Sequence, residues 1–160
     1  MTKDTHKIIA LKVLDNFNLN KNQGKEFLIG NTFADFIPHY AARQHYPQES
    51  MGHVLTTDKR DISLFKLGAL SHLVSDFLCT PHFNNWRLYS LNAINHIKFE
   101  KKLEEIAYSF SFPLINKETN KTININDEIK ELCEFAKEDY EENLRAAYLA
   151  SSLMVENFIS

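Results

Sequence analysis

Apolar residues recur at intervals of three and four along most of the chain, which is the spacing of one face of an α-helix. This pattern predicts helices over residues 5–17, 23–29, 61–79 and 88–108. A further amphipathic stretch begins at Asp127 and reaches toward Phe158, with a break expected near Asn143. A surface helix is expected over residues 48–59.

Turn-forming residues set the expected ends of these helices. Thr5 is the candidate N-cap of the first helix, Gly30 ends the second, and Pro81 ends the third because proline cannot continue a helix. Residues 31–47 and 109–125 are expected to be loops. The first of these is long for a small domain, and loops of that length are usually functional.

Scarcity of turn residues indicates the fold class. The chain has only four glycines and four prolines in 160 residues, which favours long helices over many short strands. A chain of this length can bury a core of its own. We therefore expect an all-α fold, a helical bundle in which residues 1–160 form a single domain.

Composition excludes several classes of protein. Lys and Arg number 18 against 21 Asp and Glu, so the net charge of −3 argues against binding nucleic acid through a global positive charge. There is no apolar run of the roughly 18 residues that a transmembrane helix needs. The N-terminus lacks the apolar stretch of a secretory signal, and Cys79 and Cys133 are too few for a disulfide framework. We expect a cytoplasmic protein.

Chemically reactive residues lie on stripes that should face the core. His72 and Asp76 are four residues apart, so they project from one helix face, and His96 and Glu100 repeat this geometry on the next helix. His6 lies on the inner stripe of the first helix. A buried carboxylate without a partner costs several kcal/mol, and the facing stripes carry no Lys or Arg. Imidazole and carboxylate are ligands that suit zinc, so we expect a metal cleft between the helices.

Each of these residues also has a simpler interpretation. A single histidine on an apolar stripe is more often a hydrogen-bonded core residue than a ligand, and an isolated i,i+4 pair is common on exposed faces. We interpret His39 as a loop residue, His53 as a surface-helix residue and Cys79 as a core thiol beside the site. Two such pairs on consecutive helices, together with His82 after Pro81, make coincidence a poor explanation.

The spacing of these residues resembles a known signature. The segment His72-Leu-Val-Ser-Asp76-Phe-Leu-Cys-Thr-Pro81-His82 is similar to the H-x3-D-x5-H signature of the zinc-dependent phospholipase C family, whose relatives include single-strand-specific zinc nucleases. His96 and Glu100 match the H-x3-E element of the phospholipase branch. Upstream, Asp35 matches a loop aspartate of the family. His45 is the candidate for the histidine that follows it, with His53 as the alternative.

The resemblance implies up to three zinc ions. One would be held by Asp35, His45, His72 and Asp76, a second by His82, His96 and Glu100, and a third by His6 and the bridging Asp76. Secreted relatives complete the third position with the backbone of an N-terminal Trp. Here the chain begins with Met1, so backbone atoms of Met1 or Thr2 are candidates, and two or three ions are expected.

The resemblance also implies a reaction. Zinc-bound water has a pKa near 7, which suits hydrolysis of phosphoesters. We expect a zinc-dependent phosphodiesterase in which Asp35 and Asp76 are catalytic, acting on a phosphoester small molecule or a phospholipid headgroup. Membrane lipid is a doubtful substrate without an obvious basic amphipathic anchor. A nuclease or nucleotide phosphodiesterase and a non-catalytic metal-stabilised module are the alternatives, and the oligomeric state stays open.

Overall fold

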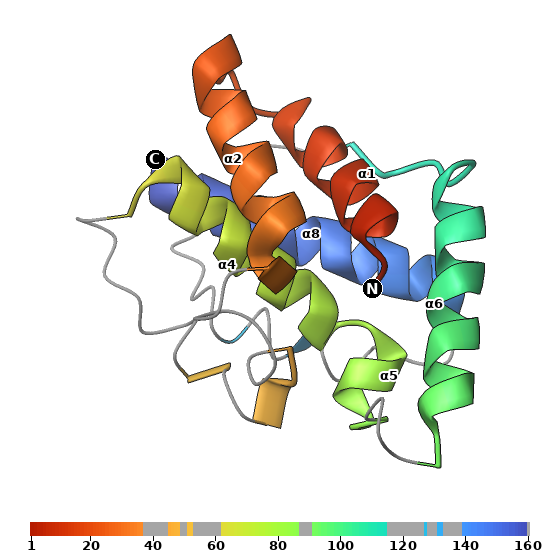
Figure 1. Cartoon of the computed structure of the whole chain (residues 1–160). Helices are drawn as coiled ribbons and strands as arrows, with labels where there is room; N and C mark the ends of the chain where they lie inside the picture. The colour runs from red at the N-terminus through yellow and green to blue at the C-terminus, as the bar shows by residue number, and fades with distance from the viewer. Residues whose placement is uncertain are drawn as a thin grey trace.

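All regular elements in the described part of the chain are helices. The computed structural model describes residues 1–36, 45–48, 51–52, 62–86, 91–114, 127, 131–132 and 139–159. Its elements are α1 (Lys3–Leu14), α2 (Lys21–Phe33), the 3-10 helix η1 (Ala34–Phe36), α4 (Leu64–Phe77), α5 (Thr80–Phe83), α6 (Ala93–Ala107) and α8 (Tyr140–Ile159). The expected all-α fold is thereby confirmed (Figure 1). None of the described helices is long and apolar enough to span a membrane.

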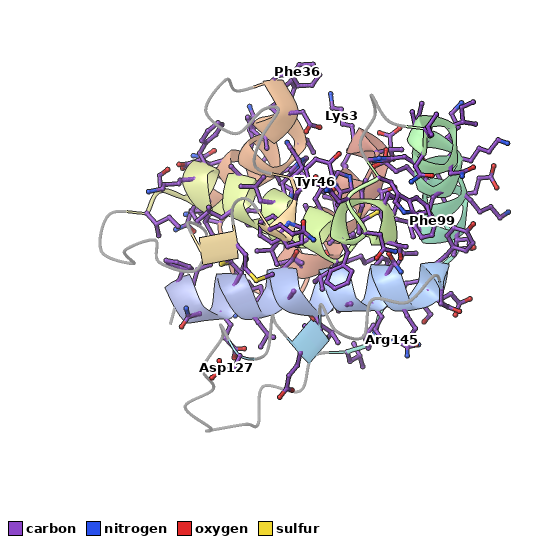
Figure 2. All side chains as sticks on the ribbon, turned by 90° about the horizontal axis from the view of Figure 1, so that it is seen from below. Lys3, Phe36, Tyr46, Phe99, Asp127 and Arg145 are labelled. Carbon is purple, nitrogen blue, oxygen red and sulfur yellow. The ribbon has the colours of Figure 1, made fainter. Side chains whose placement is uncertain are left out.

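Helix α4 is the centre of the bundle. Every residue from Leu67 to Phe77 is buried, which is typical of a helix covered on all sides. Helix α2 packs against one side of α4, and α8 packs against α4, α1 and α6. Figure 2 shows α8 as a layer along one edge of the molecule, with the other helices stacked on it.

Helices α2 and α4 cross with almost no side-chain volume between them. A Cβ atom on Gly30 would lie 1.9 Å from the carbonyl oxygen of Phe65, and one on Gly68 would lie 2.1 Å from the carbonyl oxygen of Phe27. Only glycine permits so close an approach. The crossing therefore fixes the C-terminal part of α2, from which Asp35 follows, against the first turns of α4.

The observed ends of the helices differ from the predicted ones. Helix α1 begins earlier because Thr2, rather than Thr5, is the N-cap, and its hydroxyl oxygen accepts a hydrogen bond from the Thr5 amide. Helix α2 begins after Asn20, which forms a capping box with Gln23. It also continues through Gly30, where the glycine serves the crossing with α4 rather than a helix stop.

Two further predictions about the later helices need correction. Pro81 lies in the first turn of the short helix α5, where its missing N–H costs nothing, and α4 has already ended at Phe77. The break expected near Asn143 lies slightly earlier, because Asp139 is not helical and α8 begins at Tyr140 and then runs through Asn143. Helix α6 spans Ala93–Ala107 within the predicted range 88–108. Of the helix predicted over 48–59, residues 48, 51 and 52 are described, and all are helical.

Candidate metal centre

Five elements converge on one buried cluster of imidazoles and carboxylates. Helices α4 and α6 each contribute two side chains, and helices α1 and α5 contribute one each. The remaining two side chains come from the segment after α2. The structure brings together all the ligands proposed from the sequence, which are His6, Asp35, His45, His72, Asp76, His82, His96 and Glu100. His39 and His53 lie outside the described residues, so the choice between His45 and His53 stays a prediction.

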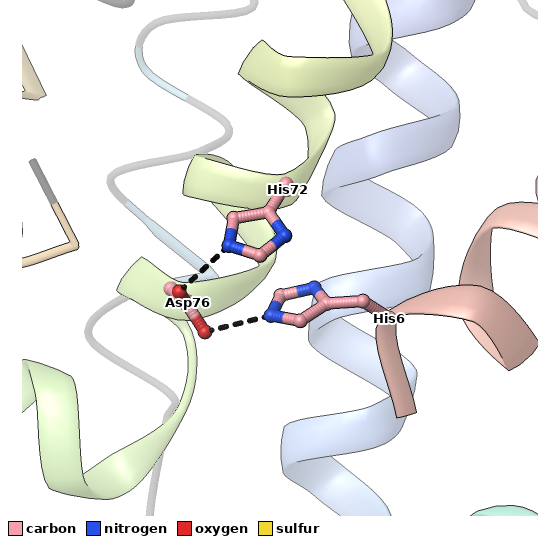
Figure 3. Close-up of side chains that lie close together, drawn as sticks. All are labelled: His6, His72 and Asp76. Carbon is pink, nitrogen blue, oxygen red and sulfur yellow. Dashed lines mark hydrogen bonds and ion pairs between the residues drawn. The ribbon is translucent and has the colours of Figure 1, made fainter. Parts of the chain in front are cut away.

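Asp76 is the hub of the cluster. Its Oδ1 atom lies 2.5 Å from the amino nitrogen of Met1 and 3.1 Å from Nε2 of His6. Its Oδ2 atom lies 2.6 Å from Nδ1 of His45 and 3.4 Å from Nε2 of His72. Figure 3 shows the rings of His6 and His72 next to this carboxylate. The two rings are stacked, with centroids 3.7 Å apart. Both oxygens thus serve different neighbours, as a bridging ligand requires.

Glu100 gathers a second group on the α5 and α6 side. Its Oε1 atom lies 3.0 Å from Nε2 of His82 and 3.0 Å from Nε2 of His96. The Met1 amino nitrogen is 2.8 Å from the same oxygen. Cys79 belongs to this group too, because ligand atoms of Cys79, His82 and Glu100 all lie within 4.8 Å of one another.

Asp35 opens the cluster to solvent. Its Oδ1 atom lies 3.3 Å from Nε2 of His72 and 3.4 Å from Nε2 of His45. The side chain is 43% exposed, whereas the facing side chains of His72 and Asp76 are almost completely buried. A molecule approaching the cluster from solvent therefore meets Asp35.

Backbone carbonyls hold three of the imidazoles in place. The Nδ1 atom of His72 donates to a carbonyl at 2.8 Å, that of His82 donates to one at 3.0 Å, and that of His96 makes a third such bond. The accepting carbonyls belong to Asn31, His45 and Trp86 respectively. A carbonyl can only accept, so Nδ1 carries the proton and the Nε2 lone pair of each neutral ring points into the cluster.

This orientation produces a conflict that a cation resolves. In a neutral ring held in this way, the Nε2 lone pair of His82 faces the oxygen lone pairs of Glu100, and that of His72 faces two carboxylates. Nε2 of His72 is buried and has no hydrogen-bond partner in the described part of the chain. Acceptors turned toward acceptors repel each other unless a positive charge lies between them. The imidazole and carboxylate groups, and the way their lone pairs face one another, fit the ligands of a divalent metal ion such as zinc.

The protonation states agree with this interpretation, with one exception. Burial lowers the pKa of His6 to about 3 and also lowers the pKa of His82, so both rings are neutral at pH 7. Burial would raise the pKa of the Asp76 carboxyl, but the surrounding imidazoles and the Met1 ammonium hold it well below its usual range. His72 is the exception. Burial disfavours its charge, yet its contacts with Asp35 and Asp76 raise its pKa to about 9.

A buried ammonium supplies the positive charge that the facing helix stripes lack. The Met1 amino group is completely buried, and it contacts Asp76, Glu100 and Nε2 of His82, the last at 3.3 Å. A cation at this point compensates two buried carboxylates at once. Met1 was proposed from the sequence only as a source of backbone ligands, so its pairing with Glu100 is a new feature.

Asn143 has a supporting role that the sequence does not predict. Its side chain is fully buried, and its Oδ1 atom accepts hydrogen bonds from the Thr80 amide at 2.7 Å and the Thr80 hydroxyl at 3.1 Å. These bonds hold the start of α5 and thereby position His82. The available signal was a polar residue on the apolar stripe of a long helix, which was interpreted as a break.

Comparison with known proteins agrees with the geometry. The family model described as zinc-dependent phospholipase C matches residues 5–150. No curated protein and no solved structure matches the chain. The matched range includes every candidate ligand side chain named above, and it covers nearly the whole length of the chain. On this evidence the chain belongs to the zinc-dependent phospholipase C family.

Proposed function

We propose that this protein is a zinc-dependent phosphoester hydrolase, a phospholipase C-like phosphodiesterase. The observation that carries the proposal is the set of imidazoles whose Nδ1 atoms are held by carbonyls and whose Nε2 atoms face carboxylates. Such carbonyl-bound histidines are typical of metal ligands, since the second nitrogen fixes the ring and its tautomer. Family membership supports zinc and hydrolysis as the general chemistry.

We assign the ligands to positions by the groups they form. Asp35, His45, His72 and Asp76 would hold one ion, while His82, His96 and Glu100 would hold a second. His6 and Asp76 would hold a third. When bound, zinc supplies hydroxide at neutral pH and neutralises phosphoryl oxygens.

Asp35 is the residue that we expect to meet the attacking water. Burial raises its carboxyl pKa, but the neighbouring imidazoles of His72 and His45 together outweigh burial and keep the pKa below its usual value. The carboxylate is therefore ionised at neutral pH and can accept a proton or a hydrogen bond. Its exposure places it where substrate and water enter. Asp76, buried behind it, keeps the imidazoles oriented.

The surface beside Asp35 supports a lipid phosphoester as substrate. Phe33 and Phe36 flank Asp35 in sequence and are 45% and 71% exposed. The Lys3 ammonium lies 4.4 Å from the Phe33 ring centroid and 5.9 Å from that of Phe36. Figure 2 shows Lys3 and Phe36 on the edge opposite α8. Exposed aromatic rings combined with a lysine suit the interface of a phospholipid bilayer. The three residues come from α1, α2 and η1, so no single helix of the sequence shows this surface.

A nucleotide phosphodiesterase is the second candidate, and one cavity favours it. About 270 Å³ of space is lined by Trp86, Asn95, Lys98, Phe99 and Tyr140. The Trp86 carbonyl also accepts a hydrogen bond from His96, so the cavity adjoins the α6 side of the cluster. Aromatic walls with a lysine suit a base and its phosphate.

Hydrolysis assays separate these candidates. We expect the zinc-loaded protein to hydrolyse an aryl phosphodiester of choline and phosphatidylcholine vesicles, and to lose both activities in EDTA. Asp35→Asn should lower the rate by about 10²-fold or more, because a general acid–base group contributes about that factor. Faster cleavage of short oligonucleotides would favour the second candidate. Full zinc occupancy without turnover of any phosphoester would leave a metal-stabilised module.

The contribution of the exposed Phe36 ring to vesicle hydrolysis can be tested with a matched control variant. Phe36→Ala should reduce hydrolysis of vesicles severalfold and leave the soluble aryl substrate unchanged, since only the vesicle contacts Phe36. Tyr108→Ala removes another exposed aromatic ring, at the end of α6, and should change neither rate. Equal effects of the two variants on vesicle hydrolysis would contradict the role of Phe36.

A further inference from the structure

Cys79 lies at the junction of α4 and α5, within the candidate metal centre. It is the N-cap residue of α5, and its side chain has no exposed surface. The sequence predicts a core thiol beside the site, and both the burial of Cys79 and its neighbours agree with this. The structure adds which ligands it lies next to. Its Sγ atom, a ring nitrogen of His82 and a carboxylate oxygen of Glu100 lie within 4.8 Å of one another. Thiol, imidazole and carboxylate therefore share one small volume.

A cation already lies at this meeting point. The Met1 ammonium is 2.8 Å from Oε1 of Glu100 and 3.3 Å from Nε2 of His82. The Cys79 Sγ atom lies within 4.8 Å of the ligand atoms of both residues. The thiol therefore borders the place where an imidazole and a carboxylate already hold a positive charge.

We propose that Cys79 binds, as a thiolate, the metal ion held by His82 and Glu100. The proposal rests on the proposed function, in which these two residues are ligands. On binding, the S–H bond of Cys79 breaks, its proton leaves to solvent, and a sulfur–metal bond forms. No oxidant or reductant is needed. A metal ion deprotonates a coordinating thiol outright, so burial of the free thiol does not prevent the step.

A thiolate here would make the ligands on the Glu100 side chemically different from those around Asp35. Together with His96, whose Nε2 is 3.0 Å from Glu100 Oε1, the chain would offer this ion four protein ligands, one of them sulfur. The candidate position around Asp35 is the one open to solvent, and it retains access to water. The sulfur donor also selects zinc, cobalt or cadmium over magnesium and calcium.

Cobalt substitution tests the proposal directly. Cobalt(II) bound to a thiolate shows a sulfur-to-metal charge-transfer band in the near ultraviolet, which imidazole and carboxylate ligands do not produce. We expect this band when the metal-free full chain is titrated with Co²⁺ under reducing conditions. Cys79→Ser should abolish the band and weaken cobalt binding at one position by about tenfold or more. Cys133→Ser, the matched control, should retain the band at full intensity.

The outcomes separate this proposal from the proposed function. Absence of the band in the wild-type chain, or its persistence in Cys79→Ser, would overturn the assignment even if hydrolysis is sensitive to chelators. A Cys79-dependent band in a protein without hydrolytic activity would support the thiolate and refute the proposed function. If Cys79→Ser does not fold, the Cys133→Ser spectrum decides alone, because the chain has only two cysteines.

Discussion

Replacing Asp76 by Asn removes the charge at the hub while preserving the size of the side chain. The carboxylate lies within ion-pair distance of the Met1 ammonium and four imidazoles, so an amide presents a donor to at least one group that is itself a donor. Loss of one partner from a buried ion pair costs about 3–5 kcal/mol in the metal-free protein. The larger functional consequence is weaker zinc binding, because Asp76 would bridge two ions.

The effect on zinc binding can be expressed as a thermal shift. Free zinc at 100 times its dissociation constant stabilises a folded protein by about 2.7 kcal/mol. At about 2–4 °C per kcal/mol for a chain of this size, that raises Tm by roughly 5–11 °C. If Asp76→Asn weakens binding about 100-fold, the same zinc concentration equals the new dissociation constant and contributes only about 0.4 kcal/mol, or roughly 1–2 °C.

The assay compares each protein with itself. Tm is measured in EDTA and at one buffered zinc concentration, so any destabilisation of the metal-free variant cancels in the difference. Zinc content by elemental analysis checks the result independently. Asp15→Asn is the matched control, because this carboxylate is 71% exposed and its pairing with Lys12 is 3.8 Å long. An Asp76→Asn protein that keeps the wild-type zinc content and thermal shift would refute the assignment of Asp76 as a bridging ligand.

Three further predictions concern packing, support and pH. Gly68→Ala should lower the free energy of unfolding by about 1–3 kcal/mol in urea titrations, because its Cβ meets the α2 backbone. Gly24→Ala, whose Cβ has room, should be neutral or stabilising, and equal losses would refute the role of the crossing. Asn143→Ala should weaken zinc binding by about 10–100-fold in a chelator competition assay, and unchanged affinity would exclude a positioning role. Protonation of His72, with a pKa of about 9, stabilises the metal-free fold below pH 6.5, and this contribution is lost as the pH rises through 9. Zinc needs the neutral ring, so its affinity should rise between pH 6.5 and 9 when measured by calorimetry, and a flat profile would contradict this.

The parts of the site that the sequence predicts are those fixed by local geometry. An i,i+4 pair on a helix shares a face wherever the helix lies, so the relation of His72 to Asp76 and of His96 to Glu100 follows from spacing alone. The choice of His6 follows from its position on an apolar stripe. These inferences need only the correct secondary structure, and small errors at helix ends do not affect them.

The parts that sequence does not predict depend on contacts between distant segments. Gly30 is a stop signal in isolation, and only the approach of the Phe65 carbonyl explains why it lies inside a helix. Asn143 is a helix breaker by propensity, but its bonds to Thr80 reverse that preference. The pairing of the Met1 amine with Glu100 joins two segments about a hundred residues apart, and no local pattern encodes it.

Because backbone carbonyls hold three of the imidazoles, the orientation of these rings does not depend on the side chains of the residues that accept their hydrogen bonds. The atom that orients His96 is the carbonyl of Trp86, whereas the indole of the same residue lines the neighbouring cavity. Exchange of the indole for another side chain leaves the carbonyl available. Variation of the side chain at position 86 can therefore change the cavity lining without changing the orientation of the His96 imidazole. Substrate specificity can diverge in this way while the metal ligands keep their positions.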